Sequence, residues 1–555
     1  MKKQLIIAAA ILAAGLSAQA ATNIVSANIT SSTVWTSDNV YYLQDVIYVE
    51  PGATLKIEPG TKVIGNTSGT LVIASGAQIF AKGTKDNPII MTSDQDDGTQ
   101  RTANNEWGNL TIMGDALVSA TLDGIGSDSG QPDGTDQAQM EGLASAGSLS
   151  IYGGPNDDHD AGTVSYVSLR YGGEVIGFGN ELNGMSIGGV GRETQMDHID
   201  IWNNVDDGLE IWGGTVNLKY VSIWNIGDDS FDLDQGYRGK AQFGLIVQGW
   251  SDDGSPSQGS GIGDNIFEMD GAENSVAQPY GAVSIYNFTA IGQPLSGDQG
   301  TEWRDNMRAQ LRNCVFMDVG DKMIKDGTTG GDGGGYPVGD ELATLFARPY
   351  NVYPANAVGV DPAALYPNFT DGTWCEISDT VFYNLSEYTT ITNFGQEANN
   401  NVIDAGSSPI VSITRGPTNI VGGLQQALVV GLDPRAANDA ATSVNMAPND
   451  GFFTPAAYRG GFSPNYNWME GWTAAAEYGI VDTSANSDPV SIDTLNLGAA
   501  FTFQSEAGVT YDVEFTDNLL NPFVKVDEVA GTGAVESYID AANLSASGFY
   551  RLVVQ

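Results

Sequence analysis

The chain has 555 residues, of which 70 are Gly, and only 16% of its residues are charged. It is too long for one compact core and too rich in turn formers for a helical protein, so we expect an all-β chain with several domains or an extended repeat. The 23 basic and 68 acidic residues give a formal charge of -45. This charge argues against nucleic acid and anionic membranes as partners, because both attract basic surfaces.

Residues 1–20 have the pattern of a Sec-type signal peptide. Lys2 and Lys3 precede an apolar stretch over residues 5–16, and Ala18-Gln19-Ala20 is a small-residue cleavage site. No Cys follows the apolar stretch, so we do not expect a lipid anchor. The rest of the chain has no run of about 18 apolar residues that would span a membrane as a helix. The sequence therefore predicts a secreted or cell-surface protein.

The first mature segment, residues 48–93, consists of short apolar runs between regular corners. Pro51 and Pro59 are followed by Gly76 and Gly83, and the residues between them alternate apolar and polar side chains. Brief strands with frequent corners are typical of an up-and-down sheet or a solenoid.

A repeat in the central segment distinguishes between these two architectures. A shift of 22 positions places "IDIWNNVDDGLEI" on "VSIWNIGDDSFDL", so Asp206 and Asp207 coincide with Asp228 and Asp229. A shift of 24 positions places Asn183 on Asp207, and the same shift forwards places the second Asp doublet on Asp252 and Asp253. A fixed period of this length with stacked identical positions predicts a solenoid.

We interpret the solenoid as a right-handed parallel β-helix with three short strands in each coil. The spacing of leucine-rich repeats is absent, although their period is similar. The inward side chains would form apolar columns, and the outward side chains between them would form a solvated face that includes Glu210, Asp232 and Asp234. The inward columns are Met185, Leu209 and Phe231, and next to them Ile187, Ile211 and Leu233.

Three further segments complete the predicted domain organisation. The β-helix spans residues 21–484 and carries long surface loops, notably the Gly- and Pro-rich excursion 326–372. An aromatic segment near residues 451–479 is expected to cap or close the solenoid. Residues 485–555 alternate apolar and polar side chains, which predicts a separate C-terminal β-sandwich.

Several phrases resemble a large, mostly uncharacterised family of secreted bacterial β-helix proteins with the pectin-lyase-like fold. They are "GATLKIEPGTKVIG", the central repeat from "ELNGMSIGG" to "GYRGKAQF", and "AAYRGGFSPNYNWMEGWT". The resemblance covers most of residues 40–475 and implies the β-helix fold, but it implies no agreed activity.

A partial resemblance to polygalacturonase-type glycoside hydrolases concerns the Asp doublets. Those enzymes carry an Asn-x-Asp pattern and, one coil later, a Gly-Asp-Asp pattern, which correspond here to Asp207 and to Gly227-Asp228-Asp229. The resemblance would make Asp207 and Asp229 water-activating carboxylates and Asp228 the general acid. The Gly-His-Gly and Arg-x-Lys patterns of that family do not follow, which argues against catalysis.

Three interpretations of the Asp doublets remain open. As corner residues, Asp and Asn would accept hydrogen bonds from backbone N–H groups between strands. As catalytic residues, they would form stacked acid and base carboxyls. As ligands, they would bind Ca²⁺, because stacked like charges need protons or a cation; this metal set is Asp206, Asp207, Asp228, Asp229, Asp252 and Asp253.

Other residues are candidates for contact with carbohydrate or for a cross-link. Trp202, Trp212 and Trp224 could stack on sugar rings, and Arg238 is the nearest cation to the Asp doublets. Cys314 and Cys375 could form a disulfide in an exported protein, and with two His in the chain they make no convincing zinc site.

The sequence favours an exported surface or matrix protein that engages a polysaccharide or cell-surface component without cleaving it and is stabilised by Ca²⁺. No organic cofactor is expected, because no phosphate-binding or dinucleotide-binding motif is present. A polysaccharide hydrolase or lyase that acts through the Asp doublets is the alternative. The oligomeric state is left open.

Overall fold

The structure is a computed structural model. It describes residues 21–122, 134–177, 180–251, 263–273, 275–297, 299–327, 335–337, 339–353, 362–394, 399–421, 423–483, 494–496, 500–505, 507–516, 523–532, 535–539 and 549–554. The predicted signal peptide, residues 1–20, lies outside the described residues. Among the residues described, no helix is long and apolar enough to cross a membrane.

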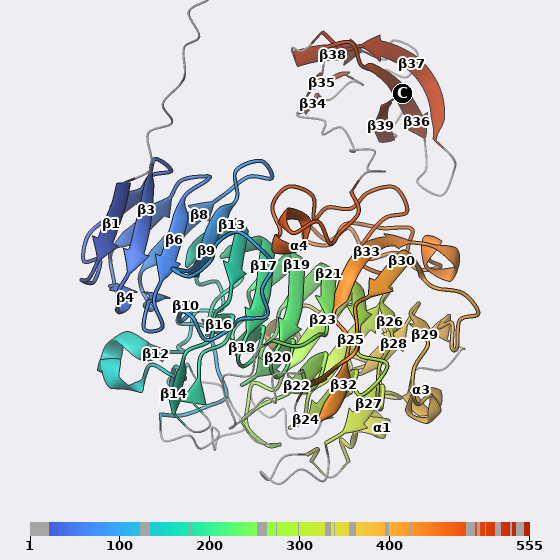
Figure 1. The fold of residues 1–555 in the computed structure, drawn as a ribbon. Helices are drawn as coiled ribbons and strands as arrows, with labels where there is room; N and C mark the ends of the chain where they lie inside the picture. Colours follow the sequence, from blue (N-terminus) through green and yellow to red (C-terminus); the bar gives the residue numbers. More distant parts are fainter. Residues whose placement is uncertain are drawn as a thin grey trace, which may run out of the picture.

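The chain folds as the predicted right-handed parallel β-helix, and successive coils lie side by side from the blue to the yellow part of Figure 1. One side of the helix is a parallel nine-stranded sheet. Its strands are β4 (Val46–Val49), β7 (Thr70–Ile73), β10 (Leu110–Met113), β16 (Met185–Gly188), β18 (Leu209–Trp212), β20 (Phe231–Asp234), β22 (Phe267–Asp270), β24 (Thr301–Arg304) and β27 (Ile324–Asp326).

A sixteen-stranded parallel sheet forms the other two sides of the helix. Its strands are β1 (Ala21–Val25), β2 (Thr33–Trp35), β3 (Asn39–Leu43), β5 (Thr54–Ile57), β6 (Lys62–Gly65), β8 (Gln78–Lys82), β9 (Ile89–Ser93), β13 (Gly162–Arg170), β17 (Gln195–Asn204), β19 (Asn217–Ile226), β21 (Lys240–Val247), β23 (Ala282–Ile291), β25 (Arg308–Arg312), β26 (Val315–Met317), β28 (Glu376–Ser378) and β29 (Val381–Tyr383).

Each long strand of this sheet contributes two sides of a coil. Residues 162–165 of β13 pair with β8, whereas residues 167–169 pair with β9. Between the two halves, Tyr166 has a φ of 51°, in the left-handed region, and the strand turns a corner there. Together with the short strand of the nine-stranded sheet, this gives the three strands per coil that the sequence predicts.

The register of the strands confirms the 22- and 24-residue repeats. Met185 pairs with Leu209 and Gln195 pairs with Asn217. The inward columns are fully buried and continue into β22 as Phe267 and Met269. These stacked apolar side chains are the core of the solenoid.

The described part of the excursion 326–372 packs against the β-helix through apolar side chains. Its helices α1 (Leu342–Leu345) and α2 (Pro362–Leu365) contribute Leu342, Leu345 and Leu365 to the main hydrophobic core. The Leu365 carbonyl accepts a hydrogen bond of 3.1 Å from Arg238. The described part of the excursion therefore packs on one side of the solenoid.

A late segment, residues 439–482, runs back along the sixteen-stranded sheet, and we name it the crossing segment. Its contacts are spread over several coils of the β-helix. Gly461 N donates to Thr289 (2.9 Å), Ala474 N donates to Asp200 (2.9 Å), and Glu470 pairs with Lys85 (2.9 Å). The segment includes α4 (Ala474–Glu477). The aromatic region near 451–479, which the sequence led us to expect to cap or close the solenoid, thus covers the flank of the β-helix.

The remaining helices and strands are short. They are η1 (Ala144–Ser150), β11 (Ala138–Gln139), β12 (Ile151–Tyr152), β14 (Val175–Gly177), β15 (Asn180–Glu181), α3 (Thr389–Phe394), β30 (Ile410–Arg415), β31 (Asn419–Val421), β32 (Leu424–Gln426), β33 (Val429–Ala436) and η3 (Asn438–Ala441).

Two three-stranded antiparallel sheets form the described part of the C-terminal region, drawn in red in Figure 1. One contains β34 (Thr494–Asn496), β35 (Ala500–Gln504) and β38 (Val535–Ile539), and the other β36 (Thr510–Thr516), β37 (Val524–Ala530) and β39 (Phe549–Val554). Phe503 and Tyr538 of the first sheet share a small core with Tyr511, Val513 and Leu552 of the second.

The disulfide considered for Cys314 and Cys375 is not formed. Both residues are free and buried, and each thiol contacts a backbone carbonyl, that of Arg312 for Cys314 and that of Met307 for Cys375. Burial raises the pKa of both thiols to about 12. Each Cys therefore serves as a small buried apolar residue of its coil.

Candidate metal centre

The Asp doublets lie at the corner that precedes each strand of the nine-stranded sheet. There, one side-chain oxygen in each coil accepts a hydrogen bond from the backbone of the next coil. Asn183 accepts from Asp207 N (3.1 Å), Asp207 from Asp229 N (2.9 Å) and Asp229 from Asn265 N (2.5 Å). The corner interpretation therefore accounts for one oxygen of Asp207 and one of Asp229.

The third rung of this ladder differs from the one expected. Asp229 is followed by Asn265, 36 residues later, and Asp264 takes the position after Asp228. The expected partners, Asp252 and Asp253, belong to an insertion that lies outside the described residues. The motif that continues the repeat is "GDNIFEMD" at residues 263–270, which matches "GDDSFDLD" at residues 227–234.

Outward carboxylates of the same sheet lie beside this corner. One column contains Glu210, Asp232 and Glu268 on three consecutive strands, and a neighbouring column contains Asp234 and Asp270. We use the name acidic cluster for the outward and corner residues together: Asp206, Asp207, Glu210, Asp228, Asp229, Asp232, Asp234, Asp264, Glu268 and Asp270.

Four carboxylates of the acidic cluster are buried, although the sequence suggested a solvated face for two of them, Glu210 and Asp232; the other six are half-buried. Asp207 is 7% exposed, Asp229 4%, Glu210 8% and Asp232 6%. Inserted segments contribute to the cover, because Glu141 and Glu181, near and in the small strands before the central coils, act electrostatically on Asp206. Water is therefore largely excluded from carboxylates that stack on one another.

Burial and mutual repulsion raise the pKa values of the acidic cluster. Burial, followed by the charges of Glu141 and Glu181, raises the pKa of Asp206 to about 8. Burial also raises the pKa values of Asp207, Asp229 and Asp232 well above the ordinary range, and neighbouring carboxylates add to the effect. These side chains must hold protons or share a cation at neutral pH.

Three groups of oxygens in the cluster are close enough to hold a metal ion. They are Asp206, Asp207 and Asp228; Asp207, Glu210 and Asp232; and Asp228, Asp229 and Asp264, with the ligand atoms of each group within 4.8 Å of one another. Oxygens at this spacing can all contact one Ca²⁺, whose bonds to oxygen are about 2.3–2.6 Å long. Four of the six residues in the predicted metal set belong to these groups.

One oxygen of the cluster supports a ligand role directly. Asp232 Oδ1 is buried and has no hydrogen-bond partner in the part of the chain that the structure describes. An unpartnered carboxylate oxygen is costly to bury, and a cation bound between Asp207, Glu210 and Asp232 would satisfy it. An all-oxygen set with several carboxylates fits Ca²⁺ better than softer metals.

Two cations neutralise part of the acidic face at one end. Arg304 pairs with Glu268 (2.9 Å) and Asp270 (2.5 Å), and Lys325 pairs with Glu302 (2.7 Å). The cluster contains many more carboxylates than these two side chains can balance.

The proposed catalytic residues Asp207, Asp228 and Asp229 do lie together in this cluster. Asp207 and Asp229 are buried and each uses one oxygen to hold the backbone of the next coil, so neither is exposed to a polymer in solution. Asp228 is more exposed. The arrangement therefore suits a structural and ligand role better than activation of water.

The expected carbohydrate platform is wrong for the residues named. Trp202, Trp212 and Trp224 are 1%, 6% and 0% exposed, and Trp202 and Trp224 are covered by the crossing segment. Their faces are already packed, so they cannot stack on a sugar. Arg238 is also buried, and its guanidinium pairs with the half-buried Asp157 at 2.6 Å.

The sequence did not indicate Glu210, Asp232 and Asp264 as ligands, nor Glu268 as their neighbour in the acidic cluster. It assigned the first two to a solvated face, because an outward position on a strand usually faces water. Asp264 and Glu268 could have been found from the match of residues 263–270 to residues 227–234, which an insertion of varying length obscures.

Comparison with known proteins identifies the type of domain. The sequence model of a family described as pectate-lyase like beta helix domain matches residues 27–331. No match was found among curated proteins. Among solved structures, the enzymatically active domain of tailspike protein 2 from bacteriophage CBA120 has 10% identity and a TM-score of 0.23, over 93% of this chain and 68% of the tailspike chain.

Proposed function

The chain belongs to the family of pectate-lyase-like β-helix domains, and from this premise we propose that it is a Ca²⁺-stabilised scaffold that binds polysaccharide without cleaving it. The N-terminal sequence pattern supports a location outside the cytoplasm. There, millimolar Ca²⁺ would be available to weak extracellular sites.

The observation that supports the proposal is that the same Asp side chains have two roles. In Asp207 and Asp229, one oxygen holds the next coil through a backbone hydrogen bond. The remaining oxygens meet those of Glu210, Asp232 and Asp264 in groups that suit a cation. Bound Ca²⁺ would remove the repulsion between coils and thereby lock the stack.

The proposal is tested by incubating the protein with soluble and immobilised polysaccharides, with Ca²⁺ and with EDTA. We expect retention on at least one immobilised polysaccharide and no release of reducing ends. Asp207→Asn and Asp229→Asn are run beside the wild type.

Release of reducing ends by the wild type that disappears in both variants would contradict the proposal. It would instead establish a hydrolase or lyase that acts through the Asp doublets, because both kinds of enzyme create reducing ends.

A further inference from the structure

A column of left-handed residues marks the bend of the long strands. Its φ angles lie between 49° and 60° in coils that follow one another directly in the sheet. The residues are Tyr166, His198, Tyr220, Phe243, Asn287, Asn313 and Asp379. Asn and Asp tolerate this conformation, whereas bulky side chains rarely adopt it. The left-handed backbone conformation of the aromatic residues therefore needs an explanation that the conformation of the polar residues does not.

The polar half of the column has a structural role. Asn287 donates to the Tyr458 carbonyl (2.9 Å) and Asn313 donates to the Asn445 carbonyl (2.8 Å). Asp379 accepts a hydrogen bond of 2.8 Å from the Asn445 side chain. These residues fasten the crossing segment to the β-helix.

The aromatic half makes no such hydrogen bonds to the crossing segment and forms a continuous stack. The ring centroids of Tyr166 and His198 are 4.0 Å apart, those of His198 and Tyr220 4.4 Å, and those of Tyr220 and Phe243 5.1 Å. Trp472 meets the edges of Tyr166 and His198, and Trp468 meets the edge of Tyr220. The stack is rigid because each ring is held on several sides.

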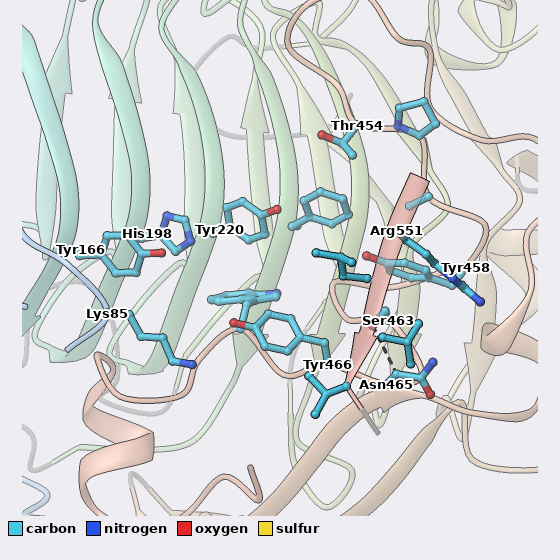
Figure 2. A pocket seen from close by; sticks show the side chains of 17 residues that line it. Lys85, Tyr166, His198, Tyr220, Thr454, Tyr458, Ser463, Asn465, Tyr466 and Arg551 are labelled. Atoms are coloured by element: carbon cyan, nitrogen blue, oxygen red, sulfur yellow. Dashed lines mark hydrogen bonds between the residues drawn. The ribbon is translucent and has the colours of Figure 1, made fainter. Parts of the chain in front are cut away.

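A cavity of about 590 Å³ lies between this stack and the crossing segment. Figure 2 shows Tyr166, His198 and Tyr220 in a row across successive strands, with Tyr466 of the crossing segment below them and Asn465 beside Ser463 farther along the cavity. Residues 551–554 of β39 lie along another side of the cavity. The volume is within the range of about 300–1,000 Å³ that ligand pockets have.

Three Tyr hydroxyls of this cavity are available for hydrogen bonds to a ligand. In the part of the chain that the structure describes, the hydroxyls of Tyr166, Tyr220 and Tyr458 have no hydrogen-bond partner. Burial raises the pKa of Tyr220 to about 12, so its hydroxyl remains neutral and can donate as well as accept.

The charged groups of the cavity are already paired. Lys85 pairs with Glu470 (2.9 Å), His198 contacts Asp197 (2.6 Å) and Arg551 pairs with Glu514 (2.6 Å). Among the described residues that line the cavity, none carries a carboxylate side chain. Free hydroxyls, aromatic surface and compensated charge suit a ligand that is neutral, rich in hydroxyls and partly apolar.

We propose that this cavity binds a neutral saccharide, whose hydroxyls would bond to the Tyr side chains and whose C–H groups would contact the edges of the stacked rings. The inference rests on the proposed binding of polysaccharide and assigns that binding to a site separate from the acidic cluster. It also explains the aromatic half of the column, because residues in an unfavourable backbone conformation gather at functional sites.

Titration calorimetry with the full chain tests the assignment, with cellohexaose, xylohexaose and mannohexaose as neutral probes and hexagalacturonate as an anionic probe. We expect binding of a neutral hexaose, a several-fold loss of affinity in Tyr220→Phe, and at least a tenfold loss in Tyr220→Asn. Asn suits the backbone at this position, as Asn287 shows, so the second variant keeps the fold. Tyr42→Phe, at a half-buried position of β3 that does not line the cavity, is the control and retains wild-type affinity.

Each of the other possible results of the calorimetry would contradict a different part of the proposal. A neutral hexaose that binds both Tyr220 variants as well as the wild type would place the sugar site elsewhere and leave polysaccharide binding intact. Preference for hexagalacturonate would overturn the neutral class. Absence of binding by any probe and by the immobilised polysaccharides would overturn both this assignment and the polysaccharide part of the proposed function.

Discussion

Asp207 has two different partners for its carboxylate. One oxygen accepts the backbone N–H of Asp229, and the side chain also belongs to two of the three oxygen groups that suit a cation. Asn can replace the first role, because its carbonyl oxygen accepts the same hydrogen bond, but it cannot supply the negative charge. The two roles can therefore be separated by substitution.

Asp207→Asn is expected to keep the stability of the wild type in EDTA, or to exceed it, because it removes a buried charge and retains the acceptor. Its stabilisation by Ca²⁺ should be much smaller. Asp207→Ala should lose about 1–3 kcal/mol even in EDTA, since the buried Asp229 N–H then has no acceptor. Urea unfolding with EDTA and with Ca²⁺ measures both effects, and equal behaviour of the two variants would contradict the separation.

Asp157 provides a pH-dependent contribution at a site distant from the acidic cluster. Burial alone would raise its pKa, but the Arg238 guanidinium, 2.6 Å away, holds the pKa below its usual range. A depressed pKa in the folded state adds stability above the unfolded-state value of about 4, and this stability is lost as the pH falls through the folded-state pKa.

Asp157→Asn should therefore reduce the free energy of unfolding by about 3 kcal/mol at pH 7, because it leaves Arg238 buried without its partner. The difference from the wild type should stay constant between pH 5 and 8, within about 0.5 kcal/mol, and shrink below about pH 4. Urea unfolding of both proteins across this range measures it. A difference that grows as the pH falls would show that the pair is not the source.

At the scale of elements, the strands and coils could be predicted because each coil repeats the same local pattern. Stacking of Leu209 on Phe231 and of Ile211 on Leu233 follows directly from the 22-residue period. The periodicity also placed Asp207 and Asp229 at a corner. It could not place the crossing segment, because no local pattern in residues 439–482 specifies which sheet they cover.

The burial of Trp202, Trp224 and the acidic cluster was not predictable for the same reason. A strand pattern tells which face of the sheet a side chain occupies, but an outward face becomes interior when a distant segment covers it. Asp200 illustrates this point, since its carboxylate is buried and accepts a hydrogen bond from Ala474, 274 residues later.

Gly461 lies where the backbone of the crossing segment passes close to the backbone of the sheet. A Cβ at this position would lie 2.3 Å from the carbonyl oxygen of Gly244, which is backbone and cannot move aside. Gly461→Ala should therefore weaken the docking of the segment by about 1–3 kcal/mol, as overpacking does. We expect faster cleavage by protease within residues 439–482 and a red shift of tryptophan emission as Trp202 and Trp224 become wet.

Gly406→Ala is the matched control, because a Cβ there would meet no atom within 4 Å. It should leave proteolysis and emission unchanged. If both variants behaved like the wild type, the close contact at Gly461 would not determine how the segment docks.

For the whole molecule, the charge of -45 works against compactness, and any salt should stabilise the fold by screening. Ca²⁺ should stabilise the fold by more than screening alone does. At a free concentration one hundred times its dissociation constant, it should raise the free energy of unfolding by about 2.7 kcal/mol. NaCl of the same ionic strength should give a smaller rise, and Mg²⁺ should be weaker because it demands a stricter geometry.

Calorimetric unfolding in EDTA, NaCl, MgCl₂ and CaCl₂ distinguishes these effects. Equal stabilisation by all three salts at matched ionic strength would mean that the acidic cluster holds protons instead of a metal ion.

The path of the crossing segment also affects how the chain acquires its structure during synthesis. Coils of a solenoid can stack one after another as they emerge from the ribosome, since each contacts only its neighbours. Here the partner of Lys85, Glu470, is synthesised 385 residues later. Trp202 likewise stays exposed until α4 has been synthesised. For most of translation, the early coils thus expose apolar side chains that the crossing segment covers later. A chaperone would bind to an exposed apolar surface of this kind.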